Sequence, residues 1–563
     1  MGDMKTARTG GQLLVDALKI HGVDMVFGVP GESYLGTLDA FYDARDAIKF
    51  VLCRQEGGAA NMADAYGKLT GRPGVCFVTR GPGATNASIG IHTAFQDSTP
   101  LVLFIGQVDG GFLEREAFQE IDFRRMYGPL SKWVAQIDRP ERVPEMVSHA
   151  FHLAVSGRPG PVVLALPEDM QTMTATVPDA GCYQRVAAHP GAADMKNLRD
   201  MLAAAERPLM LVGGGGWSAE ASSDMQAFAT ANALPVASTS RFQDVFDNRL
   251  PNYVGDVAVG MNPALMRRVR EADLLLVAGP RLGEWTTTHY TLIDIPRPKQ
   301  KFIHVHAGAE ELGRVYQGDL LINAGMPEFA AAARALAPVK PRWVEATKAA
   351  RAELDAWQTP VPMPGALNMS EVMVWLRGRL PPETILTCGA GSYVVCLHRF
   401  YSYPGFRTYL GPSSGAMGYG VPSAVAAKLV HPDRPVVSFS GDGCFLMNGQ
   451  ELATAAQHNA KIIFIVINNG IYGTIRMNQE SAFPGRVIAT DLKNPDFVTL
   501  AHAYGLYAEK VETTAGFAPA FERAWSAKGP SLLELVVDPE GVVPHTTLAQ
   551  IRERALKAGA GKH

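Results

Sequence analysis

Residues 435–443 read Pro-Val-Val-Ser-Phe-Ser-Gly-Asp-Gly, and residues 461–469 read Lys-Ile-Ile-Phe-Ile-Val-Ile-Asn-Asn. Each stretch contains a short, continuous apolar run, which is typical of a strand buried on both faces. Such strands belong to parallel sheets that carry helices on both sides. The same pattern recurs at 75–79, 100–106, 161–167, 209–213 and 273–279. The sequence therefore predicts an α/β fold built from doubly wound parallel sheets.

The length of 563 residues is too great for a single hydrophobic core and predicts several domains. Two stretches resemble linkers. Residues 171–194 lack helical or strand periodicity, and residues 338–368 begin and end in prolines around a charged helix. These stretches predict three α/β domains, at 1–185, 186–350 and 351–563.

The ends of the two quoted strands carry polar residues and glycines. Gly441, Asp442 and Gly443 follow the first strand, a helix is expected over 448–457, and Asn468 and Asn469 end the second strand. Glycines allow a ligand to approach the backbone closely, and a helix N-terminus favours phosphate oxygens. Mg²⁺ prefers oxygen ligands. We therefore predict a site for a diphosphate and Mg²⁺, with the metal held by the Asp442 carboxylate, the Asn469 amide oxygen and the Ile471 carbonyl.

This paired motif resembles that of the thiamine-diphosphate-dependent enzymes, and the resemblance extends over almost the whole chain. The nearest branch is the acetolactate-synthase-like one. The matching segments lie at 27–33, 54–60, 81–86, 94–100 and 415–422, in addition to the metal motif. The resemblance implies that the first domain binds the pyrimidine ring, that the third binds the diphosphate, and that a middle domain lies between them. It also implies a homodimer or homotetramer, because family members hold the cofactor between domains of two subunits.

The resemblance assigns roles to individual residues. Glu56 corresponds to the carboxylate that hydrogen-bonds N1′ of the aminopyrimidine and helps to remove the proton from C2 of the thiazolium ring. Met417 corresponds to the apolar residue that holds the cofactor in its bent shape, although a methionine is also a common core residue. The remaining residues implied to bind the cofactor are Pro30, Gly31, Gly415, Gly441, Asp442, Gly443, Cys444, Asn469, Ile471, Tyr472 and Gly473.

Three further residues are candidates for contact with a substrate carboxylate. Arg80 adds a cation beside the expected cofactor, Gln96 lies in a matching segment, and Lys132 could attract an anion. Lys132 has a structural alternative, because a lone lysine is usually a solvated surface residue. Glu56 itself has one, since a glutamate at the start of a helix can serve as a capping residue.

The middle domain contains Leu211-Val-Gly-Gly-Gly-Gly, ending at Gly216. A glycine turn after a strand can hold a dinucleotide, but this run lacks the full Rossmann fingerprint. Acetolactate synthases bind FAD in this domain. Residues 279–285, Gly-Pro-Arg-Leu-Gly-Glu-Trp, depart from the Arg-Phe-Asp-Asp pattern typical of that site. The sequence therefore leaves FAD binding open.

The function implied is decarboxylation of a 2-oxo acid and transfer of the resulting acyl carbanion to a second carbonyl. Three departures from the acetolactate synthase pattern concern the substrate: Arg80 replaces a small residue, Asn478 lies near the position of a tryptophan, and residues 388–392 replace an Asp-x-Gly segment. They keep two enzymatic alternatives open, a 2-oxo acid decarboxylase and a 2-hydroxyacyl lyase that releases an aldehyde. A catalytically silent regulatory protein is an alternative of another class, and a flavin-dependent oxidase is a further one.

Composition limits the partners. The net charge of −3, without a basic stripe, argues against nucleic acid, and no apolar run is long enough to span a bilayer. The six cysteines are scattered without a Cys-x-x-Cys pair, which is typical of reduced thiols. We expect a cytoplasmic enzyme that acts on a small 2-oxo acid or a related carbonyl compound.

Overall fold

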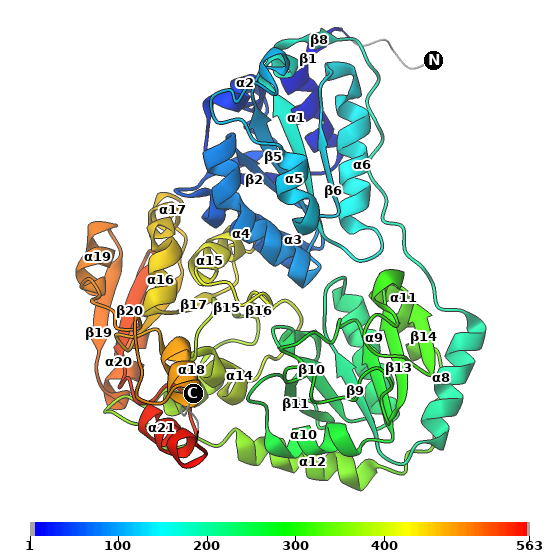
Figure 1. Cartoon of the computed structure of the whole chain (residues 1–563), viewed down its shortest axis with the longest axis vertical. Helices are drawn as coiled ribbons and strands as arrows, with labels where there is room; N and C mark the ends of the chain where they lie inside the picture. The colour runs from blue at the N-terminus through cyan, green and yellow to red at the C-terminus, as the bar shows by residue number, and fades with distance from the viewer. Residues whose placement is uncertain (1–5, 560–563) are drawn as a thin grey trace. The chain divides into compact units, whose positions relative to one another are not determined.

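The computed structural model describes residues 6–559. It contains three six-stranded sheets in which every neighbouring pair of strands is parallel. The fold class predicted from the apolar runs is confirmed. The chain divides into two compact units, one ending at Ala187 and the other beginning at Ala188. The first sheet belongs to the first unit and the other two belong to the second (Figure 1).

The first sheet has the strand order β3-β2-β4-β5-β7-β6. Its strands are β2 (Met25–Gly28), β3 (Lys49–Leu52), β4 (Gly74–Val78), β5 (Leu101–Gln107), β6 (Trp133–Gln136) and β7 (Pro161–Pro167). The core on one face is built with α1 (Gly10–Ile20), α2 (Leu35–Asp43) and α6 (Val143–Val155). The helices α3 (Glu56–Thr70) and α4 (Gly81–Asp97) pack against each other and against β4 and β5. A small antiparallel pair joins β1 (Arg8–Thr9) to β8 (Thr174–Ala175), and short helices form at α5 (Phe123–Tyr127) and α7 (Glu168–Thr172).

The second sheet has the order β11-β10-β9-β12-β13-β14. Its strands are β9 (Pro208–Val212), β10 (Val236–Thr239), β11 (Tyr253–Val257), β12 (Leu274–Ala278), β13 (Lys301–His306) and β14 (Leu320–Asn323). Two separate cores lie on its two faces. One is built with α8 (Ala192–Ala204), α9 (Ala219–Ala231) and α11 (Met326–Arg334), and the other with α10 (Pro263–Glu271). The charged helix expected in the second linker is α12 (Val344–Trp357), which packs against β11.

The third sheet has the order β16-β15-β17-β18-β20-β19. Its strands are β15 (Ile385–Cys388), β16 (Tyr409–Leu410), β17 (Val436–Gly441), β18 (Ile463–Asn468), β19 (Tyr507–Val511) and β20 (Ser531–Val536). One face carries α13 (Met369–Arg379), α14 (Val394–Phe400) and α20 (Thr514–Ser526). The other helices are α15 (Gly420–Val430), α16 (Asp442–Asn448), α17 (Leu452–Gln457), α18 (Gly473–Ala482), α19 (Phe497–Ala503) and α21 (Leu548–Lys557).

One helix boundary differs from the sequence-based expectation. The helix expected over 448–457 begins instead at Asp442, directly after β17, and a 3₁₀ turn at Gly449–Glu451 separates α16 from α17. A Cβ on Gly449 would lie 2.9 Å from the Phe445 ring, so the chain bends where a glycine allows close packing. The strand therefore runs into the helix with no loop between them.

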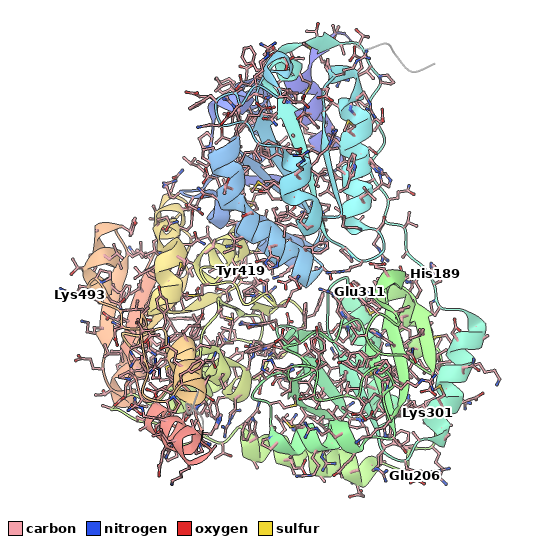
Figure 2. The ribbon with its side chains drawn as sticks, in the orientation of Figure 1. His189, Glu206, Lys301, Glu311, Tyr419 and Lys493 are labelled. Carbon is pink, nitrogen blue, oxygen red and sulfur yellow. The ribbon has the colours of Figure 1, made fainter. Side chains whose placement is uncertain are left out.

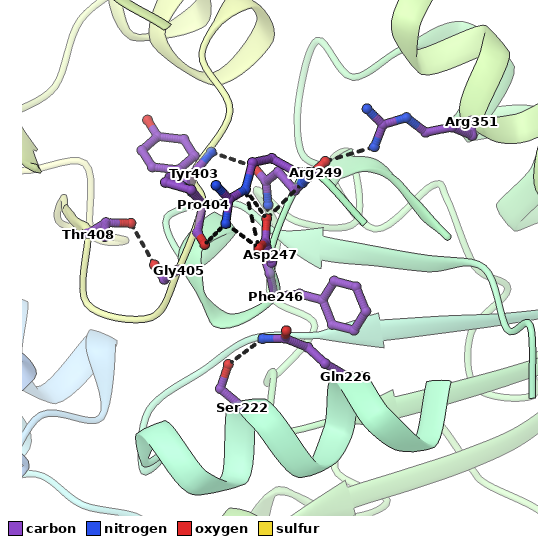
Figure 3. A network of polar contacts seen from close by, with 11 residues as sticks. Ser222, Gln226, Phe246, Asp247, Arg249, Arg351, Tyr403, Pro404, Gly405 and Thr408 are labelled. Atoms are coloured by element: carbon purple, nitrogen blue, oxygen red, sulfur yellow. Dashed lines mark hydrogen bonds and ion pairs between the residues drawn. The ribbon is translucent and has the colours of Figure 1, made fainter. Parts of the chain in front are cut away.

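The second and third sheets are joined by specific polar contacts. Arg249 donates to both carboxylate oxygens of Asp247 and, over 3.2 Å, to the Pro404 carbonyl (Figure 3). The Asn248 amide N donates to the Tyr403 carbonyl over 3.0 Å, and the Tyr403 amide donates to Asn248 Oδ1 over 3.0 Å. The segment after β10 is thereby fixed to the segment before β16.

Candidate functional site

In the third sheet, the ends of β17 and β18 bring the predicted diphosphate and metal residues together. The two strands are parallel neighbours, and Gly441 lies opposite Ile467. Asp442 therefore follows one strand end and Asn469 follows the adjacent one, at the same edge of the sheet. The topological switch point of this sheet lies between β15 and β17, because the chain adds β16 on one side of β15 and then β17 on the other. Ligands of doubly wound sheets bind at the carboxyl ends of strands at such a switch point.

Asp442 is buried and held by three donors. The residue is only 3% exposed. Oδ1 accepts the Gly443 amide over 2.8 Å, and Oδ2 accepts the Gly470 amide and Nδ2 of Asn494, each over 2.8 Å. Burial raises the pKa of the Asp442 carboxyl, and these hydrogen bonds oppose the rise. A carboxylate offers about four acceptor positions, so room for a metal bond remains.

The second strand end arranges its two asparagines differently. Asn469 Oδ1 accepts the Ile471 amide over 3.2 Å, which places this oxygen in the turn that carries the Ile471 carbonyl. Asn468 instead donates from Nδ2 to Glu534 over 2.8 Å, while its Oδ1 accepts from Asn494 over 2.9 Å. A carboxylate, an amide oxygen and a backbone carbonyl form an all-oxygen set, which suits Mg²⁺. No group of three or more His, Cys, Asp or Glu side chains suitable for a metal occurs among residues 6–559.

The turn before α18 has features that suit phosphate oxygens. A Cβ on Gly473 would lie 3.0 Å from Ser392 Oγ and 3.1 Å from Asn469 Nδ2, so a larger residue would crowd this turn. Oγ1 of Thr474, in the first turn of α18, is buried and has no hydrogen-bond partner among residues 6–559. A buried hydroxyl without a partner is costly, and a phosphate oxygen would supply one. The residues present therefore fit a diphosphate with Mg²⁺.

The loop that carries Met417 is fixed to α16. Gly415 and Gly418, on either side of it, have φ values of +68° and +81°, which favour glycine. The Gly418 amide donates to Cys444 Sγ over 3.2 Å, and Asn448 Nδ2 donates to the Gly418 carbonyl over 3.0 Å. Tyr419, labelled in Figure 2, is fully buried immediately before α15. Met417 is half-buried and is held beside the predicted diphosphate residues.

Glu56 is the first residue of α3, in the first compact unit. The N-cap hydrogen bond of this helix is made by Gln55, whose Oε1 accepts the Gly58 amide over 3.0 Å. Glu56 Oε2 instead accepts from Nδ2 of Asn86, on α4, over 2.9 Å. Gln55, and not Glu56, is therefore the residue that caps α3. The Glu56 carboxylate is oriented by another helix.

The switch point of the first sheet lies between β2 and β4. Pro30 and Gly31 follow β2, and Arg80 follows β4. A Cβ on Gly31 would lie 2.5 Å from Thr79 Oγ1, so the two strand ends pack closely because this residue is glycine. The predicted cofactor residues of this domain therefore share one sheet edge with Arg80.

The three substrate-side candidates have the following surroundings. Arg80 forms an ion pair with Glu168 and donates to the Phe118 carbonyl over 3.1 Å. Lys132 Nζ donates to the carbonyls of Leu153 and Ser156, at the C-terminal end of α6. Gln96 lies near the end of α4 and is half-buried. A substrate role for these residues stays a prediction, and for Arg80 and Lys132 the structure adds a protein partner.

The glycine run of the middle sheet is explained by packing. A Cβ on Gly213 would lie 1.9 Å from Thr239 Oγ1, and a Cβ on Gly214 would lie 2.3 Å from the Gly279 carbonyl. The ends of β9, β10 and β12 therefore approach one another so closely that only glycine fits. Arg281, in the segment that departs from the flavin pattern, pairs with Glu311 over 3.2 Å. The run alone therefore gives no argument for a dinucleotide.

Asn494 is a site residue that the sequence analysis missed, as is Thr474. It lies in Lys493-Asn-Pro, between α18 and α19, and nothing in that tripeptide indicates a contact with Asp442, which lies 52 residues earlier. Its role depends on a loop that folds back over the sheet edge.

In the described part of the chain, no helix is long and apolar enough to cross a membrane.

Three family models match: the N-terminal TPP binding domain of thiamine pyrophosphate enzymes over 8–126, their central domain over 195–333, and their C-terminal TPP binding domain over 389–535. The chain is 32% identical to an acetolactate synthase large subunit of Corynebacterium glutamicum, covering 95% of this chain and 88% of the relative. It is 33% identical to an acetolactate synthase of Arthrospira platensis, covering 94% of each, and 30% identical to the isozyme 2 large subunit of Escherichia coli, covering 94% and 95%.

Proposed function

Because the chain belongs to the thiamine pyrophosphate enzyme family, in its acetolactate-synthase-like branch, we propose that it decarboxylates a 2-oxo acid and transfers the acyl unit to a second carbonyl compound. The observation that carries the proposal is the oriented, buried Asp442 carboxylate beside Asn469 at the switch point of the third sheet. Thiamine diphosphate, when bound, stabilises the carbanion that remains after a 2-oxo acid loses CO₂.

Each residue group has a defined task in this proposal. Asp442, the Asn469 amide oxygen and the Ile471 carbonyl hold Mg²⁺, and the backbone of Gly441, Gly443 and Cys444 and that of Tyr472 and Gly473 surrounds the diphosphate. Met417 supports the cofactor from the loop fixed by Asn448. A loop fixed in this way would hold the bound cofactor in one orientation, so that its reacting groups would stay close together.

Glu56 is proposed to hold the proton that activates the cofactor. Asn86 orients the carboxylate by donating to Oε2, which leaves Oε1 for the aminopyrimidine ring. A positioned carboxylic acid that exchanges a proton with a ring nitrogen typically contributes about 10²–10⁴-fold to a rate. The Glu56 proposal is supported by its fixed position on α3 and by the capping role of Gln55.

Product analysis tests the proposed reaction. The protein is incubated with Mg²⁺, thiamine diphosphate and a panel of 2-oxo acids that begins with pyruvate. A branched hydroxy-keto acid from pyruvate supports ligation, whereas acetaldehyde as the only product supports a decarboxylase or 2-hydroxyacyl lyase. The departures at Asn478 and at residues 388–392 favour that second candidate. Absence of turnover with every 2-oxo acid, while the cofactor is bound, would contradict the proposal and favour a regulatory protein.

The oligomer and the flavin are the remaining proposals. A homodimer or homotetramer is supported by large apolar side chains that are exposed on or next to α16 and α18: Leu446, Met447, Ile475 and Phe483. Light scattering after size-exclusion chromatography measures the oligomer.

The absorbance spectrum of the purified protein decides whether FAD is bound. A cytoplasmic location stays an expectation from the scattered cysteines, which contain no Cys-x-x-Cys pair.

A further inference from the structure

Arg241 extends from the turn after β10 to the carboxyl end of β15. Its Nη1 donates to Cys388 Sγ over 2.8 Å and to the Tyr409 hydroxyl over 3.0 Å. The backbone of Arg241 has φ +71°, a conformation that residues with side chains rarely adopt. Such conformations persist where the surrounding structure enforces them, and they concentrate at functional sites. The fold therefore holds this arginine in a defined position between two sheets.

Within residues 6–559, the Arg241 guanidinium hydrogen-bonds a thiol and a phenol and no carboxylate. The Tyr409 hydroxyl also lies 3.0 Å from Cys388 Sγ and 2.8 Å from Nε2 of His398. Burial raises the pKa of Tyr409 and lowers that of His398 well below its usual range, so both are neutral near pH 7. A largely enclosed guanidinium normally pairs with an anion. Arg241 therefore carries a positive charge that is not paired with a carboxylate through any of its hydrogen bonds within residues 6–559.

The nearest acidic residue along the chain is engaged elsewhere. Asp244 Oδ2 accepts the backbone amides of Thr408 and Tyr409 over 3.1 and 3.2 Å. Its carboxylate acts electrostatically on Arg407 and Arg434. Asp244 thus orders the strand that carries Tyr409, and the Arg241 charge is left for another anion.

Arg241 is close to the proposed cofactor site. A Cβ on Gly411 would lie 2.9 Å from Arg241 Nη1, so the guanidinium packs over the first residue of the loop that leads to Met417. Cys388 ends β15 and pairs with Phe439 of β17, which runs on to Asp442. Arg241 therefore reaches the carboxyl ends of β16 and β15, and β15 borders the switch point at which a ligand of this sheet is expected.

We propose that Arg241 binds the carboxylate of the 2-oxo acid substrate and so determines specificity for acids over neutral carbonyl compounds. This inference rests on the proposed function. A guanidinium binds a carboxylate through two parallel hydrogen bonds. The contacts to Cys388 and Tyr409 both use Nη1, so Nη2 and Nε are the donors assigned to the substrate.

The test compares Arg241→Met with wild type, using pyruvate, or the best 2-oxo acid of the panel, as the substrate and the methyl ester of the same acid as a neutral competitive inhibitor, because the ester cannot lose CO₂. KM for the acid is expected to rise roughly 10- to 100-fold, as for loss of a charge-assisted hydrogen bond. The inhibition constant of the ester and the Kd of thiamine diphosphate, the latter measured by fluorescence titration, are expected to stay within about twofold. Arg249→Met, which removes an arginine paired with Asp247 at the same junction, is the matched control.

A second pair of variants keeps the test informative if Arg241→Met folds poorly. Cys388→Asp gives Arg241 an internal carboxylate partner and is expected to raise KM for the acid. Cys388→Ser keeps a neutral partner and is expected to raise it much less. Equal effects of the two Cys388 variants, equal effects of Arg241→Met on acid and ester, or a weakened Kd for thiamine diphosphate would overturn the inference. In those cases wild-type turnover of 2-oxo acids would leave the proposed function standing.

Discussion

Asn494 donates a hydrogen bond from Nδ2 to Oδ2 of Asp442 over 2.8 Å and a second one to Oδ1 of Asn468 over 2.9 Å. One amide group thus links the ends of β17 and β18 and fixes the orientation of the carboxylate proposed to hold Mg²⁺. Residues that orient metal ligands commonly affect metal affinity without touching the metal.

We therefore expect Asn494→Ala to weaken Mg²⁺ binding by about 10- to 100-fold. The Asp442 carboxylate would lose a donor and gain rotational freedom. Mg²⁺ dependence of thiamine diphosphate binding, followed by fluorescence titration, measures the effect. The adjacent Lys493→Ala is the control, because Lys493 is exposed (labelled in Figure 2). Equal Mg²⁺ affinities for the two variants would show that Asn494 does not order the site.

Glu56→Gln is expected to lower turnover by about 10²-fold or more, because an amide cannot exchange a proton with the aminopyrimidine. Binding of thiamine diphosphate should persist. Asn86→Ala, which removes the donor to Oε2, should lower turnover less. Pre-steady-state or steady-state rates with a 2-oxo acid measure both variants. Unchanged turnover in Glu56→Gln with bound cofactor would refute the role assigned to Glu56.

A substitution of Lys132 tests whether this residue binds the substrate or stabilises the fold. Its ammonium donates to the Ser156 carbonyl over 2.7 Å and to the Leu153 carbonyl, at the negative end of the α6 dipole. From these contacts we expect Lys132→Met to lower the free energy of unfolding by about 1–2 kcal/mol. KM for the 2-oxo acid should change less than twofold. Lys49→Met, at an exposed lysine of the same domain, is the control. A large rise in KM without loss of stability would instead support the substrate role.

The carboxyl group of Asp256 is expected to make the stability of the middle domain depend on pH. Burial raises the pKa of its carboxyl to about 7, and Gln243 is its side-chain hydrogen-bond donor, at 3.4 Å. The folded protein therefore holds this proton to a higher pH than the unfolded chain does. Its stabilisation is complete below the ordinary carboxyl pKa of about 4 and is lost as the pH rises through about 7.

The corresponding experiment measures Tm at pH 5.5 and pH 8 for wild type and Asp256→Asn. Wild type should lose more stability than the variant between these values, with a difference in Tm of about 2–5 °C. Asp294→Asn, at an exposed aspartate, controls for surface charge. Parallel pH profiles for wild type and Asp256→Asn would mean that Asp256 is ionised in the folded protein throughout this range.

The sequence predicted the larger features of the fold correctly. The run 462–467 is apolar at every position because both faces of its strand are buried, and this signal is local. It was less reliable for boundaries, as the early start of α16 at Asp442 illustrates. A glycine at an element boundary permits either a loop or a direct turn into a helix, and packing decides between them.

What the sequence by itself determined is the chain of parallel strands and the chemistry placed at their ends, because hydrophobic periodicity and residue type act over a few positions. The tertiary structure alone decided which side chains meet. Asn494 contacts Asp442, Arg241 contacts Cys388 and Lys132 contacts the end of α6, and each pair is separated by many residues. Such contacts depend on how loops pack over sheet edges. A hydrogen bond forms only where the whole fold brings a donor and an acceptor to within about 3 Å.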